Sequence, residues 1–233
     1  MIERSIDMKK VLGITGCIFL LIYLIIAGGV YTESKWVDTL DLVLIHLIQG
    51  QITETVTAAV SILTDIGGIR QVIVLTVIVT AVLLIKKMYV AGFWLSGTMM
   101  LCPVLLTVIM KMAVDRERPD FLVLATEQSQ SFPSGHTTAS TIFYGLIGTA
   151  LILAVKGLWK KLAITAVTLM IITFVMLSRI YLGAHFPTDV LGGFCFGIAS
   201  VFLSISVYQF VLAHLQKLLL KWNLHDKSPS LID

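Results

Sequence analysis

The chain has 233 residues, of which 57% are hydrophobic and 13% charged, with a formal net charge of +3. A soluble domain carries about 25% charged residues, so this chain lacks the polar surface that a protein in water needs. We therefore expect a polytopic, all-α membrane protein that forms a single domain over residues 1–233. The basic residues do not form a continuous stripe, which argues against binding to nucleic acid.

The cysteines give no sign of disulfide or metal chemistry. Cys17, Cys102 and Cys195 all fall within apolar stretches and have no Cys-x-x-Cys spacing. We expect them to be buried small side chains.

A helix that crosses a hydrocarbon core about 30 Å thick needs roughly 20 apolar residues. Six stretches predict such spans, namely residues 11–31, 72–85, 90–112, 137–155, 162–182 and 188–212. Arg4, Lys9 and Lys10 precede the first stretch, as in a cleavable signal peptide. Its apolar run is long and no Ala-x-Ala site follows, so we expect a retained span. Pro103 is expected to kink the third span.

Between the first two spans, residues 32–68 mix apolar residues at helical spacing with acidic and amide side chains. This pattern favours one or two amphipathic helices at the membrane surface, with a break at Gly67 and Gly68. At the other end of the chain, residues 222–233 are expected to form a short frayed cytoplasmic tail.

The distribution of lysine predicts the orientation in the membrane. If the N-terminus is cytoplasmic, most lysines fall on the inner side, as the positive-inside rule requires. The C-terminus is then also cytoplasmic. Lys35 and Arg70 fall on the outer side of the plasma membrane. So do four basic residues at the polar loop or the end of the fifth span: Lys111, Arg116, Arg118 and Arg179.

Ionisable groups at membrane depth are costly, so their clustering at one end of the spans predicts a functional site. Lys111, Arg118 and Arg179 would repel one another unless a multiply charged anion lay between them, and phosphate fits this description. Ser134 and Gly135 stand where a helix begins, so free backbone N–H groups would face the same anion.

Two histidines complete the predicted site. Pro187 suits the first turn of a helix, which leaves His185 just before it and Asp189 within it. Asp189 could accept a hydrogen bond from one ring nitrogen of His185 and leave the other directed at phosphorus. His136 would approach from the opposite side and protonate the departing oxygen.

These residues form three motifs in order along residues 111–189: Lys111-x6-Arg118-Pro119, then Pro133-Ser134-Gly135-His136, then Ser178-Arg179-x5-His185-x3-Asp189. Together they resemble the signature of the type 2 phosphatidic acid phosphatase (PAP2) superfamily. Within it, the chain looks most like bacterial membrane lipid phosphatases that act on phosphatidylglycerophosphate or undecaprenyl pyrophosphate.

The resemblance implies a role for each motif residue. His185 would form a phosphohistidine, Asp189 would orient it and His136 would be the general acid. The remaining residues would bind the phosphoryl group: Lys111, Arg118, Arg179, Ser134 and Gly135. Neither a metal nor a cofactor would be needed, since the cations supply the electrostatic stabilisation.

Two other classes of protein are alternatives to a lipid phosphatase. A vanadate-dependent haloperoxidase shares the anion pocket, but those enzymes are largely soluble. A non-catalytic transporter or lipid-binding protein would be expected to hold its charges near the midplane. Asp115, Arg116 and Glu117 are interpreted as a solvated charge cluster.

The partner is expected to be a membrane lipid phosphate. Undecaprenyl pyrophosphate is favoured, because its carrier is released on the outer face, and phosphatidylglycerophosphate and phosphatidate are the alternatives.

Overall fold

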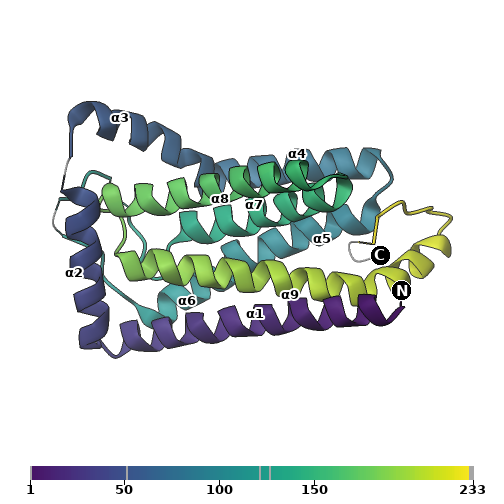
Figure 1. Ribbon diagram of the computed structural model, residues 1–233, viewed down its shortest axis with the longest axis horizontal. Helices are drawn as coiled ribbons and strands as arrows, with labels where there is room; N and C mark the ends of the chain where they lie inside the picture. The colour runs from purple at the N-terminus through teal and green to yellow at the C-terminus, as the bar shows by residue number, and fades with distance from the viewer. Residues whose placement is uncertain (1, 51, 121, 126, 231–233) are drawn as a thin grey trace.

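The structure is a computed structural model that describes residues 2–50, 52–120, 122–125 and 127–230, with side chains from residue 10 onward (Figure 1). The described residues fold into helices without any β-strand. In chain order these are α1 (Ile2–Tyr31), α2 (Lys35–Gln49), α3 (Glu54–Leu63), a 3-10 turn (Thr64–Gly67), α4 (Ile69–Ile85), α5 (Tyr89–Met99), a π-helical segment (Met100–Leu106), α6 (Thr107–Val114), α7 (Gly135–Ala154), α8 (Leu158–Tyr181) and α9 (Pro187–Leu220).

The spans agree with the predicted six-span bundle. Five helical stretches are long and apolar enough to cross a membrane: Lys10–Tyr31, Tyr89–Val114, Gly135–Ala154, Leu158–Tyr181 and Pro187–Leu220. A sixth crossing results if the pair Glu54–Gly67 and Ile69–Ile85, bent by 43°, is one broken span. The bend falls at the predicted glycine break, so the second span begins earlier than the sequence indicated.

The third span changes its helical geometry at the predicted position. Pro103 lies inside the π-helical segment between α5 and α6, where the N–H of Thr107 donates to the carbonyl of Cys102. Proline cannot donate to the α-helical ladder, and a wider turn accommodates the loss. The helix therefore departs from α-helical geometry around Pro103, the residue at which a kink was predicted.

Helix α9 lies at the centre of the bundle, in contact with α1, α2, α5, α7 and α8. Small residues allow its close approach to α7. A Cβ atom added at Gly193 would lie 2.8 Å from the carbonyl oxygen of Ser134, and one at Gly197 would lie 2.6 Å from Cβ of Thr141. These two glycines of α9 therefore serve helix packing, and they bring the start of α7 beside the start of α9.

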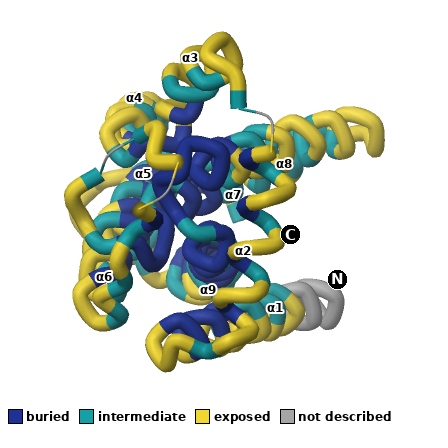
Figure 2. Tube along the Cα trace, turned by 90° about the vertical axis from the view of Figure 1, so that its left-hand side faces the viewer, coloured by how far each residue is buried: buried dark blue, intermediate teal, exposed yellow. Residues whose placement is uncertain are grey.

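Helix α2 crosses the end of the bundle at which α8 ends and α9 begins (Figure 1). Figure 2 looks onto this end. The helix is amphipathic as predicted: it buries Val37, Asp41, Ile45 and Gln49 against the bundle and leaves the opposite face exposed. Its buried face carries an aspartate, which needs a partner when it is removed from water.

The C-terminal tail differs from the frayed segment that was expected. The carboxylate of Asp226 accepts from the N–H of Val90 (3.0 Å), and the hydroxyl of Ser228 accepts from the N–H of Ala91 (2.9 Å). These side chains satisfy donors at the start of α5, which its own helix leaves unpaired. The prediction was wrong for this part of the tail, and residues 231–233 lie outside the described residues.

Candidate active site

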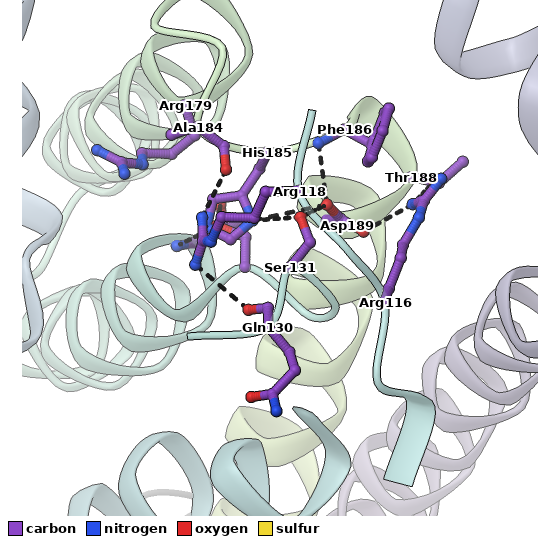
Figure 3. Close-up of polar contacts among 12 residues, drawn as sticks. Arg116, Arg118, Gln130, Ser131, Arg179, Ala184, His185, Phe186, Thr188 and Asp189 are labelled. Atoms are coloured by element: carbon purple, nitrogen blue, oxygen red, sulfur yellow. Dashed lines mark hydrogen bonds and ion pairs between the residues drawn. The ribbon is translucent and has the colours of Figure 1, made fainter. Parts of the chain in front are cut away.

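The site lies at the end of the bundle that α2 crosses, where Asp41 of α2 meets Arg116. Figure 3 shows the polar contacts of the site. It combines the end of α6, the loop between α6 and α7, the start of α7, the end of α8 and the start of α9. Hydrogen bonds and ion pairs connect the predicted site residues, directly or through residues of the loop: Lys111, Arg118, His136, Arg179, His185 and Asp189. Residues up to 78 positions apart in the sequence thus meet at one place, as the span topology predicted.

His185 is held in the short connection between α8 and α9. Gly183 turns the chain there with φ of +64°, a conformation that favours glycine, and its backbone is so close to the carbonyl of Leu122 that a Cβ would not fit. The side chain of His185 is 1% exposed, with Nε2 3.2 Å from Nη1 of Arg118 and Nδ1 3.6 Å from Oδ2 of Asp189. One ring nitrogen therefore faces the cations and the other the carboxylate.

Ser131 completes the contact between His185 and Asp189, and sequence analysis missed it. The predicted direct hydrogen bond is too long at 3.6 Å. The hydroxyl of Ser131 lies 3.4 Å from Nδ1 of His185 and donates to Oδ2 of Asp189 at 2.5 Å. Ser131 is fully buried. Its position just before the Pro133-Ser134-Gly135-His136 motif was the available signal.

The imidazole of His185 is neutral near pH 7. Burial lowers its pKa to about 4, although the negative charge of Asp189 nearby acts in the opposite direction. A neutral imidazole retains a lone pair on one ring nitrogen. With Nδ1 facing Asp189 and Ser131, that lone pair belongs on Nε2, the nitrogen that faces Arg118.

Asp189 is fixed by a set of contacts that we call the anchoring cluster, made of Asp41, Arg116, Thr188 and Asp189. Arg116 donates from Nη1 to Oδ1 of Asp189 and from Nη2 to Oδ2 of Asp41, both at 2.7 Å. Asp189 also accepts from the N–H of Phe186 at 2.9 Å, which caps the start of α9. The carboxylate of Asp189 is therefore held from both sides.

The structure corrects the interpretation of Arg116 as part of a solvated charge cluster. Asp115 ends α6 in the left-handed conformation, with φ of +49°, and this turns the chain so that Arg116 faces the bundle. Asp115 and Glu117 remain exposed, as expected. Alternating positions of an extended segment face opposite ways, and hydropathy alone could not show which position faces inward.

A second set of contacts, the anion cluster, consists of Arg118, Glu127, His136 and Arg179. Arg179 donates to Oε1 of Glu127, Arg118 donates to Oε2 at 3.1 Å, and Nδ1 of His136 lies 3.7 Å from Oε1. Burial alone would raise the pKa of Glu127, but Arg179, the two histidines and Arg118 outweigh it and hold the pKa below its usual value. Glu127 is thus an ionised carboxylate among the groups predicted to bind phosphate.

Sequence analysis also missed Glu127, since a single acidic residue in a polar loop follows no spacing rule. Of the other three residues predicted to bind phosphate (Lys111, Ser134 and Gly135), the first two have contacts within the protein. Lys111 donates to the carbonyl of Gln130, and the hydroxyl of Ser134 accepts from the N–H of Thr137 as the N-cap of α7. A Cβ at Gly135 would meet no atom within 4 Å. Their roles toward phosphate stay predictions.

A cavity of about 460 Å³ opens beside the anion cluster. Glu127, His136 and Arg179 line one part of it. The end of α3, the 3-10 turn and the start of α4 supply a largely hydrophilic wall, which includes Ser61, Thr64, Asp65, Arg70 and Gln71. Residues of the 32–68 segment therefore line the cavity beside the anion cluster. In the described part of the chain, no three His, Cys, Asp or Glu side chains are arranged to hold a metal ion.

Known proteins share this sequence and fold. Phosphatidylglycerophosphatase B of Bacillus subtilis is 42% identical over 100 residues, which are 42% of this chain and 49% of that protein. Decaprenylphosphoryl-5-phosphoribose phosphatase of Mycobacterium tuberculosis is 34% identical over 96 residues, which are 40% of this chain and 48% of that protein. The chain spans about half the length of the curated relatives it matches.

Two solved structures are similar to the whole bundle. The transmembrane PAP2 type phosphatidylglycerolphosphate phosphatase from Bacillus subtilis has a TM-score of 0.75 at 28% identity, covering 84% of this chain and 97% of that one. LpxE of Aquifex aeolicus has a TM-score of 0.54 at 24% identity, covering 70% of this chain and 93% of that one, and supports the fold alone. The model of the PAP2 superfamily matches residues 91–212, just over half of the chain and all three motifs. The resemblance that the motifs predicted is confirmed, and this chain belongs to the PAP2 superfamily.

Proposed function

We propose that this protein is a membrane lipid phosphatase that moves the terminal phosphoryl group of a lipid phosphate or pyrophosphate to His185 and then to water. The anion cluster carries this proposal. Arg118 and Arg179 hold a carboxylate between them, and Nε2 of His185 lies 3.2 Å from Nη1 of Arg118. A phosphoryl group in place of the Glu127 carboxylate would meet the same cations beside the nucleophile.

The chemistry follows from the two histidines. Nε2 of His185 attacks phosphorus as the bond from phosphorus to the leaving oxygen breaks, and His136, in its imidazolium form, gives its proton to that oxygen and becomes neutral. His136 then takes a proton from water, which attacks the phosphohistidine and releases inorganic phosphate. Asp189 and Ser131 stabilise the proton on Nδ1 throughout. Arg118, Arg179 and Lys111 offset the charge of the transferred group, with no step assigned to a metal or cofactor.

The cavity supports a polar leaving group. His136 lines it and His185 does not, so the atoms next to the transferred phosphoryl group would enter it. Arg70 and Gln71 on its far wall suit a second phosphate better than an acyl chain. We therefore favour undecaprenyl pyrophosphate. The name of the Bacillus subtilis relative keeps phosphatidylglycerophosphate as the alternative, whose glycerol would also find polar partners, and phosphatidate is a third candidate.

The proposed site lies on the extracytoplasmic side of the plasma membrane, with both termini in the cytoplasm. The start of α1 and the end of α9 lie at the end of the bundle opposite α2 (Figure 1). Lysines cluster at that opposite end, where α4 ends, α8 begins and α9 ends, and such clusters face the cytoplasm by the positive-inside rule. Labelling of a cysteine placed at exposed Asp120 in intact cells would test it, and labelling only after lysis would overturn it.

The function is tested by phosphate release from the three lipids by purified protein in detergent, with and without EDTA. We expect release that survives EDTA, is inhibited by vanadate and is fastest with undecaprenyl pyrophosphate. His185→Ala supplies the background. Absence of release from every lipid would contradict the proposed function, and activity that EDTA removes and magnesium restores would contradict the cation-based mechanism.

A further inference from the structure

We propose that Arg116 and Asp41 are a positioning pair that sets the charge and orientation of the His185 and Asp189 dyad. Helix α2 thereby contributes a positioning residue, Asp41, to the active site, although it carries none of the motif residues. The inference rests on the proposed function, in which His185 is the nucleophile, and it adds residues to which the family motifs assign no role.

The guanidinium of Arg116 is fixed on three sides. Its two terminal nitrogens each donate to a different carboxylate, Asp189 and Asp41, at 2.7 Å. Its central carbon lies 4.1 Å from the ring centroid of Phe186, the residue that follows His185. The side chains of Arg116, Asp41 and Asp189 are 15%, 3% and 0% exposed. A planar fork held in this way can move only if both carboxylates move with it.

Asp41 holds the start of α9 as well as Arg116. Its Oδ1 accepts from the N–H of Thr188 at 2.8 Å, and its Oδ2 accepts from the hydroxyl of Thr188 at 2.9 Å. About two turns further along α2, Gln49 donates to the carbonyls of Ile180 and Tyr181 at the end of α8. Helix α2 therefore contacts both the end of α8 and the start of α9, and His185 lies in the connection between these two helices.

The charges alternate outward from the nucleophile: neutral His185, anionic Asp189, cationic Arg116 and anionic Asp41. Burial alone would lower the pKa of Arg116, but Asp189 and Asp41 outweigh it and raise the pKa. Other charged groups also act on the dyad, and each would stay in place when the pair is changed: Lys111, Arg118, Glu127, His136 and Arg179.

This arrangement predicts opposite effects on His185. Without the charge of Arg116, Asp189 would attract the proton of the imidazole more strongly, so the pKa of His185 would rise. Without the charge of Asp41, the positive charge of Arg116 would be less compensated, so the pKa of His185 would fall. A pair that only stabilised the fold would shift neither.

The experiment compares Arg116→Gln, Asp41→Asn and the double variant, with Asp38→Asn, an exposed carboxylate on the same helix, as the matched control. Asparagine can still accept from the N–H of Thr188. The dependence of kcat/KM on pH is measured in detergent with a lipid phosphate that the unchanged protein hydrolyses. We expect the acid limb to move up for Arg116→Gln and down for Asp41→Asn.

Rates and inhibition sharpen the test. We expect kcat of Arg116→Gln to fall about tenfold to 100-fold, as for other misplaced catalytic groups. Inhibition by vanadate should stay within twofold of the unchanged protein, because neither residue contacts the anion cluster. The double variant should behave like Arg116→Gln alone, since Asp41 acts through Arg116. Additive losses in the double variant would overturn the inference.

An unmoved acid limb in both single variants, or shifts in the same direction, would also overturn it, whatever the loss of activity. Titration of His185 by histidine-labelled NMR in detergent, assigned with His185→Gln, gives the same opposite shifts without turnover. If the protein hydrolyses no lipid phosphate, the proposed function fails while this titration still decides whether the pair acts on His185.

Discussion

The two ion clusters on either side of His185 use the same kinds of side chain but differ in burial. In the anchoring cluster, the carboxylates of Asp41 and Asp189 are 3% and 0% exposed and belong to helices. In the anion cluster, the carboxylate of Glu127 is 28% exposed and belongs to a loop. Arginines partner the carboxylates in both.

The difference in burial separates a fixed contact from an exchangeable one. Removing one partner of a buried ion pair leaves an uncompensated charge in the interior, at a cost of about 3–5 kcal/mol. A partly exposed pair contributes about 1 kcal/mol or less, because water and salt screen it. The anchoring cluster can therefore hold the nucleophile permanently, while the carboxylate of Glu127 can give way to a phosphoryl group.

The largest expected effect comes from the residue between the clusters. His185→Ala should lower phosphate release on the order of 10⁴-fold or more, as when other catalytic nucleophiles are removed. The fold should persist, which size-exclusion chromatography and a thermal melt would show. His46→Ala, which removes an exposed histidine of α2, is the control and should retain activity. Retention of activity by His185→Ala would exclude the phosphohistidine mechanism.

The next effect separates the two clusters by their ligands. Arg118→Gln should lower kcat/KM about 10²-fold to 10³-fold, the usual effect of removing one preorganised electrostatic contact. It should also weaken inhibition by vanadate, because Arg118 belongs to the anion cluster. Arg116→Gln should leave vanadate inhibition nearly unchanged. Equal weakening of vanadate binding in both variants would remove the distinction between the clusters.

The buried neutral His185 predicts a pH dependence of stability. Its pKa of about 4 in the folded protein lies below the ordinary value of 6.5, so between these values the unfolded chain binds a proton that the folded one does not. The contribution of His185 to the free energy of unfolding should therefore be fully present above about pH 6.5. It should be lost as the pH falls toward 4, which lowers the free energy of unfolding by up to about 3 kcal/mol.

Thermal melts in detergent at pH 7.5 and 5 would measure this dependence. The same two melts of His185→Gln provide the comparison, since glutamine does not titrate. We expect the difference in Tm between the two pH values to shrink in His185→Gln. An unchanged difference would mean that His185 is not held neutral by burial.

The smallest effect concerns the exchangeable carboxylate. Glu127→Gln should tighten inhibition by vanadate and by inorganic phosphate about fivefold, because an anion no longer competes for Arg118 and Arg179. Glu117→Gln removes an exposed carboxylate of the same loop and is the matched control. Weaker inhibition in Glu127→Gln would show that Glu127 assists anion binding and does not occupy its position.

Local patterns predicted the elements of this protein well. Proline at the first turn of α9 placed His185 before that helix and Asp189 within it, and this is the arrangement that the structure has. The π-helical turn at Pro103 and the break at Gly67 and Gly68 were likewise readable, because each depends on the chemistry of one or two residues. The structure of the C-terminal tail could not be predicted in this way, because the tail is held by backbone N–H donors at the start of α5, far away in the sequence.

Residues that act through distant partners escaped the sequence. Asp41 and Arg116 are 75 positions apart, and nothing in the spacing of either residue indicates the other. Ser131 and Glu127 depend in the same way on the path of the loop between α6 and α7. Their contacts exist because the bundle brings together helix ends that hydropathy alone leaves independent.

The sequence by itself determined that the chain is a membrane protein, how many spans it has and which motif residues meet at one end, since hydropathy, span length and topology fix these properties. The tertiary structure alone decided how the charges pair: Arg116 with Asp189, and Glu127 with Arg118 and Arg179. Pairing depends on burial and direction, which follow from packing. The same charged side chain becomes an anchor or an exchangeable contact according to how far water can reach it.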